Sequence, residues 1–319
     1  MREAEPRGDP PAGADAAERR RALILLVVIP AFFGTNMLVA RAVAGDIPPV
    51  ALAFWRWTLV FALLAPWTVR PLWRQRHAVR REWRDLALLG AFGMGVCGAF
   101  VYVGAETTTA TNIGLIYGAS PILIVLLTGL GGHERLTQRQ LAGVVASLAG
   151  VLVLIFRGDP AALLAVRLVP GDLWIACASA AWAGYAVILR YRPSALDPAT
   201  RFAAVILYGC AIMAPFHLAE ALAGDLPAVD PTTRAGAITL GAIALVAVVP
   251  GIGAYQGYAR IQRTLGAATT GLVLYLTPLY TALLAWLLLD EALHPYHLVG
   301  AALILPGIWL ATRRPVARR

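Results

Sequence analysis

Polar side chains interrupt the long apolar runs of this chain at a few positions, and the most unusual of them is Arg56. It lies in ALAFWRWTLV, seven residues after Pro49, in a run that has no other charge. An arginine there has two possible uses. Its stem can reach back so that the guanidinium leaves the apolar layer, or the guanidinium can bind an anion or carboxylate inside a cavity. The sequence leaves both interpretations open.

Amides and aromatic rings at similar depth are further candidates for contacts with a solute. Asn36 and Asn112 can supply directional hydrogen bonds to a bound molecule or tie neighbouring helices together, and the sequence favours neither. Aromatic side chains near mid-depth would form walls suited to an apolar or aromatic solute, or would simply pack the core. These aromatic candidates are Tyr117, Trp182, Tyr185 and Tyr275.

The remaining reactive residues argue against an enzyme. The chain contains no HExxH, GxSxG or P-loop motif and no paired carboxylate in its apolar runs. Cys97, Cys177 and Cys210 have neither CxxC nor metal-ligand spacing, so we interpret them as packing residues. We therefore expect no metal, no cofactor and no catalysis. Only Glu106 and His217 are even remotely placed for proton transfer, so the sequence does not support proton coupling.

The elements that carry these residues are predicted to be membrane-spanning helices. The chain is 59% hydrophobic and 14% charged, with a mean hydropathy of +0.69, which differs from a soluble domain. A spanning helix needs about 20 mostly apolar residues. Ten charge-poor stretches meet this need: 22–43, 50–69, 86–104, 112–130, 139–156, 172–189, 202–219, 235–255, 266–288 and 296–312.

The charged residues indicate how these spans are oriented. All 27 basic residues are arginine, and the net charge is +9. With a cytoplasmic N-terminus, 22 arginines fall on the inner side and one, Arg56, falls within a span. Four fall outside: Arg41, Arg157, Arg167 and Arg234. This asymmetry predicts that both termini are cytoplasmic, and it explains the basic charge without a nucleic acid. The charged tail 1–21 is predicted to be disordered, and the apolar run after it is too long for a signal peptide.

An internal repeat divides the spans into two sets of five. Residues 109–150 align with 266–307 at a shift of 157, with 13 of 42 positions identical. The segments FGTNMLVAR, ending at Arg41, and WAGYAVILR, ending at Arg190, align at a shift of 149. Because five is odd, the second set is predicted to be inverted relative to the first, as in many secondary transporters.

Glu134 and Glu291 occupy equivalent positions in this repeat. Each precedes a predicted helix start, marked by a Thr137–Gln140 capping box in one repeat and by Pro295 in the other. We expect the two glutamates to order loops at the membrane surface; the alternative is a gate contact.

Two stretches resemble a known family. TNIGLIYGASPILIVLLTGLGGHERLTQRQLAGVVASLAGVLVLI resembles the second part of an EamA domain, with its Asn, mid-helix Pro, glutamate motif and final Gly. PGDLWIACASAAWAGYAVILR resembles the start of a second copy. The resemblance covers nearly all of the chain after residue 21 and indicates the drug/metabolite transporter superfamily. It implies an all-α membrane protein of ten helices in two inverted repeats, 22–156 and 172–312, around a central cavity. Many bacterial members export amino acids or other small metabolites.

Small departures from the family pattern bear on selectivity. Phe33 precedes Gly34 where the family often has Trp, although the usual basic residue is kept as Arg41. His133 stands where Gly is commoner. A changed aromatic side chain facing the cavity would alter which solute is accepted, while the fold would stay the same.

We therefore expect a secondary transporter of the cell inner membrane that exports small metabolites such as amino acids by alternating access. Its expected partners are a small-molecule solute and membrane lipid. The first alternative is a lipid-linked or nucleotide-linked sugar carrier of the same superfamily, which would favour more embedded cations than Arg56 alone. A passive pore and a membrane-embedded enzyme fit the sequence less well. The solute, the coupling ion and the oligomeric state do not follow from the sequence.

Overall fold

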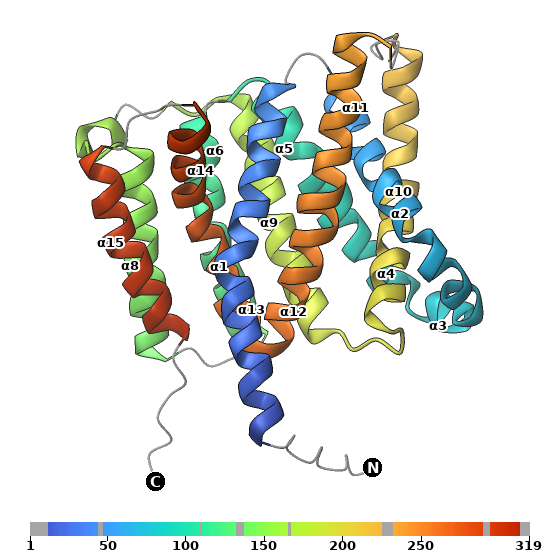
Figure 1. The fold of residues 1–319 in the computed structure, drawn as a ribbon, viewed down its shortest axis with the longest axis horizontal. Coiled ribbons are helices and arrows are strands. Elements are labelled where there is room, and N and C mark those ends of the chain that lie inside the picture. The colour runs from blue at the N-terminus through green and yellow to red at the C-terminus, as the bar shows by residue number, and fades with distance from the viewer. Residues whose placement is uncertain are drawn as a thin grey trace.

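The computed structural model describes residues 12–43, 47–108, 110–131, 137–164, 167–224, 232–289 and 294–312 of the 319-residue chain. Within these ranges all regular structure is helical (Figure 1). The elements in chain order are α1 (Ala12–Ala42), α2 (Pro49–Arg74), α3 (Arg76–Arg81), α4 (Trp83–Leu89), η1 (Gly90–Val96), α5 (Cys97–Ala105), α6 (Ala110–Gly118), α7 (Ser120–Leu130), α8 (Gln138–Ile155), η2 (Pro160–Leu163), α9 (Pro170–Tyr191), α10 (Pro198–Leu222), α11 (Arg234–Val246), η3 (Ala247–Ala254), α12 (Tyr255–Leu265), α13 (Ala267–Gly271), α14 (Val273–Leu289) and α15 (Pro295–Thr312).

The described helices form a multi-pass membrane protein, as their apolar composition predicts. Six segments are long and apolar enough to cross a bilayer: Pro49–Arg74, Trp83–Ala105, Gln138–Ile155, Pro170–Tyr191, Pro198–Leu222 and Arg234–Leu265. Two further apolar helices, Ile116–Leu130 and Pro295–Ala311, are shorter. The predicted spans at 112–130 and 266–288 are each divided, into α6 and α7 and into α13 and α14. The total of ten spans therefore stays a prediction. The first helix starts at Ala12, within the tail that composition predicts to be disordered.

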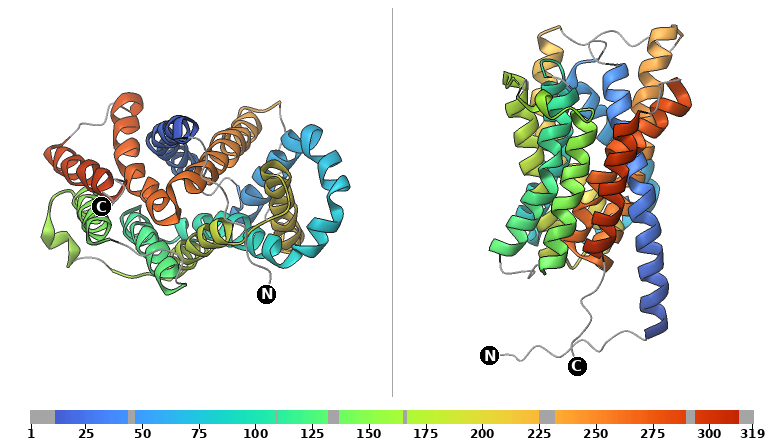
Figure 2. Two further views of the ribbon diagram at one scale, coloured as in Figure 1. Left: turned by 90° about the horizontal axis from the view of Figure 1, so that it is seen from below. Right: turned by 90° about the vertical axis from the view of Figure 1, so that its left-hand side faces the viewer.

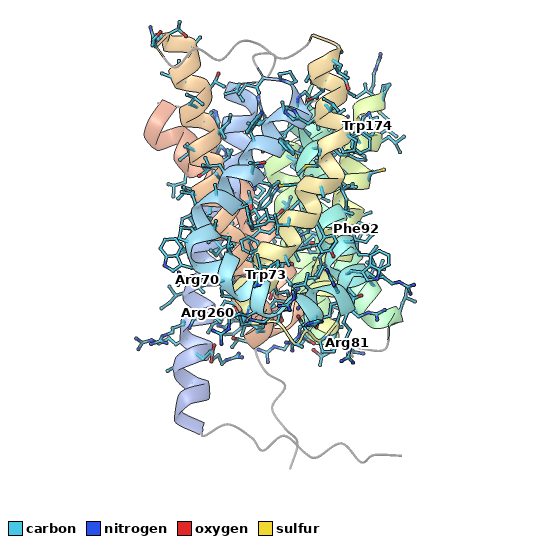
Figure 3. All side chains as sticks on the ribbon, turned by 90° about the vertical axis from the view of Figure 1, so that its right-hand side faces the viewer. Arg70, Trp73, Arg81, Phe92, Trp174 and Arg260 are labelled. Carbon is cyan, nitrogen blue, oxygen red and sulfur yellow. The ribbon has the colours of Figure 1, made fainter. Side chains whose placement is uncertain are left out.

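Large apolar side chains face outward, where they suit contact with lipid. The three tryptophans predicted to lie at the membrane boundary are at least half exposed: Trp67, Trp73 and Trp83. Figure 3 shows Arg70, Trp73, Arg81 and Arg260 at the same end of the bundle, the end where α1 begins. Arginine and tryptophan thus gather at one end of the bundle, as expected for a membrane–water boundary.

The helices α8 and α15, which are equivalent in the sequence repeat, pack closely against each other. Gly143 lies against the Gly307 carbonyl, and a Cβ on Gly150 would lie only 2.7 Å from the Gly300 carbonyl oxygen. Along this pair one residue number rises as the other falls, so the two helices are antiparallel. The Ser147 hydroxyl donates to the Ile304 carbonyl at 3.4 Å, and these two positions are 157 residues apart. A residue that contacts its own repeat equivalent marks a two-fold axis. In the left view of Figure 2 this pair forms one end of the elongated cross-section.

Two π-helical segments occupy equivalent positions in the repeat. The segment η1 begins at Gly90 and η3 begins at Ala247, 157 residues later. Both are rich in glycine, and η3 also contains Pro250, which cannot donate a backbone hydrogen bond. Pro250, Gly251 and Gly253 predict a weakened helix at η3, and the structure has wider π turns there and also at η1, where the small residues predict only close helix approach. Such turns occur often at functional sites.

Side chains cap several helix ends. The predicted capping box of α8 is confirmed, because Gln140 N donates to the Thr137 hydroxyl at 3.2 Å while Thr137 N donates to the Gln140 side chain at 3.0 Å. The Glu220 carboxylate of α10 accepts hydrogen bonds from Val50 N and Ala51 N at 3.1 and 2.8 Å, at the positive start of α2. Glu134 and Glu291 lie outside the described residues.

Candidate functional site

The candidate site is built around Arg56, whose guanidinium lies between three helices. The Arg56 side chain of α2 is only 4% exposed. Its Nη1 donates to Asn36 Oδ1 of α1 at 2.9 Å and to the Tyr102 hydroxyl of α5 at 3.2 Å. The Tyr102 hydroxyl in turn donates to Asn36 Oδ1 at 2.8 Å. Arg56, Asn36 and Tyr102, named here the Arg56 site, thus form a closed triangle of hydrogen bonds.

The other edge of the Arg56 guanidinium has no partner among the described residues. Its Nε is buried and has no hydrogen-bond acceptor among the residues that the structure describes. Within the same residues, neither an acceptor for Nη2 nor a carboxylate within salt-bridge distance is found. The guanidinium carbon lies 4.7 Å from the centre of the Trp57 ring, which gives a cation–π contact. A buried cation without a counter-charge is costly, so this edge is suited to an anion from outside the described chain.

Aromatic side chains continue from the Arg56 site into the centre of the bundle. Trp57 meets Tyr255 edge-on, with 4.8 Å between ring centres, and Tyr255 meets Trp182 in the same way at 5.5 Å. We call the full set the aromatic cluster: Phe33, Trp57, Trp182, Tyr185, Phe202, Tyr255 and Tyr258. Trp57, Trp182, Tyr185, Tyr255 and Tyr258 are each 4% exposed or less. In this conformation these rings pack against one another.

The aromatic cluster lies where the two repeats meet. Phe33 of α1 and Trp182 of α9 are equivalent positions at the shift of 149, and their rings are in edge-on contact with 5.4 Å between centres. This is a second place, after Ser147 and Ile304, where a residue contacts its own counterpart. Phe33 is also the position at which the chain departs from the family pattern, so the departure lies in the cluster itself.

The structure brings four of the seven predicted site residues together. Asn36 and Arg56 are in direct contact, and Trp182 and Tyr185 belong to the aromatic cluster. Asn112 instead donates to the Asp172 carboxylate at 2.8 Å and to the Arg167 carbonyl at 3.0 Å, which ties α6 to the start of α9. Those contacts support the helix-tying interpretation of Asn112.

The two remaining predicted residues, Tyr117 and Tyr275, lie in different parts of the core. The Tyr117 hydroxyl is 3.5 Å from Cys97 Sγ of α5. Tyr275 is fully buried in the apolar packing around α1, α8 and α15, and its hydroxyl has no partner among the described residues. Tyr117 thus packs against the apolar core that contains Tyr102 and Tyr255, next to the Arg56 site, whereas Tyr275 belongs to the other core.

Several residues of the site were missed by reasoning from the sequence. Tyr102 completes the hydrogen-bonded triangle, and Trp57 and Tyr255 link it to the aromatic cluster. Trp57 directly follows the single embedded cation, and Tyr255 and Tyr258 lie three residues apart on one helix face. These signals are present in the sequence, although they do not distinguish a site from ordinary core packing. Tyr102 has no signal of this kind.

A multi-pass helical bundle with two related halves, an aromatic cluster where the halves meet and a buried arginine beside that cluster is typical of a membrane transporter. The chain belongs to the EamA-like transporter family, whose model matches residues 20–156 and 169–313. The two matched regions correspond to the two copies of the sequence repeat. This membership agrees with the absence of enzyme motifs from the sequence.

Relatives and a solved structure support this assignment. The chain is 24% identical over 293 residues to an "Uncharacterized transporter" of Archaeoglobus fulgidus, covering 91% of this chain and 97% of the relative. It is 26% identical over 301 residues to a "Probable amino-acid metabolite efflux pump" of Escherichia coli, covering 90% and 93%. A crystal structure that is 23% identical in sequence superposes with a TM-score of 0.69, over 94% of this chain and 96% of that one. The last comparison shows a shared fold.

Proposed function

We propose that the protein is a secondary transporter that exports small carboxylate-bearing metabolites, such as amino acids, across the cell inner membrane. The observation that carries this proposal is the edge of the Arg56 guanidinium that has no partner in the part of the chain that the structure describes. Nε and Nη2 of an arginine form a fork that matches the two oxygens of a carboxylate. The aromatic cluster next to it suits an apolar or aromatic side chain on the same solute. The name of the Escherichia coli relative supports amino-acid metabolites as the first solutes to test.

In the proposed mechanism, the carboxylate of the solute is the negatively charged partner that Arg56 does not have among the described residues. Asn36 and Tyr102 hold Nη1, which fixes the plane of the guanidinium and leaves its second edge for the solute. Because the aromatic rings fill the centre in this conformation, binding requires the two repeats to move apart. The π-helical segments η1 and η3 are suited to this movement, since their backbone is already less regular than an α-helix. Tyr255, the residue directly after η3, links the two segments because its hydroxyl donates to the Gly93 carbonyl of η1 at 2.7 Å.

Alternating access in the proposed mechanism rests on ten spans in two inverted repeats with both termini in the cytoplasm. The antiparallel packing of α8 against α15 supports inversion, because these helices are equivalent in the sequence. Labels attached at Thr137 and at His294 are expected to react from opposite faces of the membrane. Labels that react from the same face would overturn the inverted arrangement.

Solute counterflow in proteoliposomes tests the function itself. Labelled amino acids, polyamines and sugars would be offered to vesicles preloaded with the same unlabelled solute, with and without a pH gradient. We expect counterflow of amino acids and related carboxylates and little of polyamines, whose positive charge Arg56 repels. Counterflow that does not depend on the pH gradient would exclude proton coupling. Transport of sugars with no transport of carboxylates would contradict the proposal.

A further inference from the structure

A second candidate site lies on the outer surface of the bundle, away from Arg56. A cavity of about 420 Å³ opens between α1, α14 and α15. In the left view of Figure 2 these three helices follow one another along one edge of the molecule. The floor of this groove is buried and apolar, and its rim is more than half exposed. Leu26, Leu276 and Ile308 form the floor; Val27, Leu305 and Trp309 are on the rim.

One end of the groove carries positive charge. The Arg139 guanidinium of α8 lies 5.8 Å from the centre of the Trp309 ring. On α1, Arg20, Leu23 and Val27 are spaced i, i+3 and i+7, so they share one helix face. Leu23 and Val27 line the groove, so the exposed Arg20 continues the same face by one turn. Two arginines from different helices therefore flank the end of an apolar groove that has a tryptophan on its rim.

We propose that this groove binds an acyl chain of an anionic phospholipid, whose phosphate is held by Arg20 and Arg139. Inside a bilayer the hydrophobic effect does not retain a particular lipid, because neighbouring tails are as apolar as the groove. The selective contribution is the charge at the groove end, and arginines near a membrane surface attract acidic lipids. The rim position of Trp309 fits the depth at which tryptophan meets headgroups.

A second copy of the chain fits this groove less well than a lipid does. A two-fold interface through the groove would place the same patch of both copies face to face. It would bring Arg20 and Arg139 of one copy towards the same arginines of the other, and this juxtaposition of like charges is unfavourable. The occupant that the charges favour is therefore an acidic lipid.

Native mass spectrometry of the purified full-length protein tests the proposal. Two lipids with identical acyl chains would be added, the anionic palmitoyl-oleoyl phosphatidylglycerol and the zwitterionic phosphatidylcholine. We expect the anionic lipid to bind more tightly, and the double variant Arg20→Gln/Arg139→Gln to lose about 10- to 30-fold of that affinity. The control variant Arg81→Gln/Arg260→Gln removes the same charge from exposed sites elsewhere and should bind like the wild type.

A variant of the groove itself separates the chain contact from the charge contact. Leu305→Trp places a large ring on the exposed rim and should reduce binding of both lipids while the protein remains folded. Equal affinity of the wild type for the two lipids, or an arginine double variant that binds the anionic lipid as the wild type does, would overturn the proposal. So would a dimer that appears in place of the lipid-bound monomer and is lost in Leu305→Trp.

Discussion

Replacing Arg56 with Gln should abolish export of carboxylate solutes without unfolding the protein. In the variant the Tyr102 hydroxyl can still donate to Asn36 Oδ1, as it does at 2.8 Å in the wild type, so the contact between α1 and α5 is kept. The substitution also removes a cation that is only 4% exposed and has no counter-charge among the described residues. A buried cation of this kind destabilises a fold by up to several kcal/mol. The melting temperature in detergent should therefore stay the same or rise.

The expected loss of solute affinity follows from the two N–H groups of the free guanidinium edge. A hydrogen bond to a charged group contributes about 1.5–3 kcal/mol, so losing two of them weakens binding by at least roughly 100-fold at about 1.4 kcal/mol per factor of ten. Arg56→Lys keeps the charge but not the fork and should lose less. Amide analogues of the same solutes, which lack the negative charge, should bind the wild type and Arg56→Gln equally weakly.

The assay is counterflow in proteoliposomes, normalised to folded protein by the melting transition. Arg81→Gln, which removes an exposed guanidinium from α3, is the matched control and should transport like the wild type. The reasoning fails if Arg56→Gln exports carboxylates normally. It also fails if transport per folded molecule is unchanged while the melting temperature drops, because Arg56 would then be a structural residue.

Further variants test the packing, the link between the π segments and the loops. Gly150→Ala should cost about 1–3 kcal/mol of stability, because its Cβ would lie 2.7 Å from the Gly300 carbonyl oxygen. The control Gly129→Ala should be neutral or stabilising, because a Cβ there would meet no atom within 4 Å. Equal melting temperatures of the two variants would contradict close packing of α8 on α15. Tyr255→Phe should change the maximal counterflow rate about fivefold, because it removes a hydrogen bond of about 1 kcal/mol. The control Tyr275→Phe removes a hydroxyl with no partner among the described residues and should leave the rate unchanged. Identical rates for both variants would show that the hydrogen bond between Tyr255 and Gly93 has no part in transport. Burial alone would raise the pKa of Asp197, but hydrogen bonds from Thr200 and Gln75 hold it below the ordinary 3.8. The folded state then binds fewer protons than the unfolded state, so this stabilisation is complete above the unfolded pKa and is lost as the pH falls through the folded pKa. Asp197→Asn should flatten the decline of the melting temperature between about pH 5 and pH 2, and an unchanged decline would show that the carboxylate does not contribute.

The helical membrane fold and its repeat could be predicted because they depend on regular patterns. Apolar runs of fixed length and a constant shift of 157 residues survive in the sequence, and Ser147 and Ile304 show that this shift has a counterpart in space. Pro250 indicates a weakened helix at η3, although nothing in the sequence selects a π turn over a kink. Divided helices such as α6 and α7 are shorter than the apolar runs that contain them, so run length alone overstates helix length.

The candidate site could be predicted only in part. Arg56 and Asn36 are visible because polar residues are rare in apolar runs, but their contact depends on how α1 and α2 are rotated. Tyr102 joins them from a third helix, and a tyrosine in a span is too common to be noticed. Nothing in the sequence pairs Glu220 with the start of α2, where its carboxylate accepts two backbone hydrogen bonds. In each of these cases the missing information is a contact between distant segments.

Arg56 has no equivalent cation in the second repeat, and this asymmetry bears on the free energies of the two states in the proposed transport cycle. The helices α2 and α10 begin with Pro49 and Pro198, which are 149 residues apart. At this shift, the position equivalent to Arg56 in the second repeat is the buried Val205. If the two repeats were identical in sequence, the inward-open and outward-open states of the proposed cycle would be related by symmetry and would have equal free energy. With a guanidinium in one half and an aliphatic side chain in the other, the two states of the proposed cycle would differ in free energy when the protein is empty.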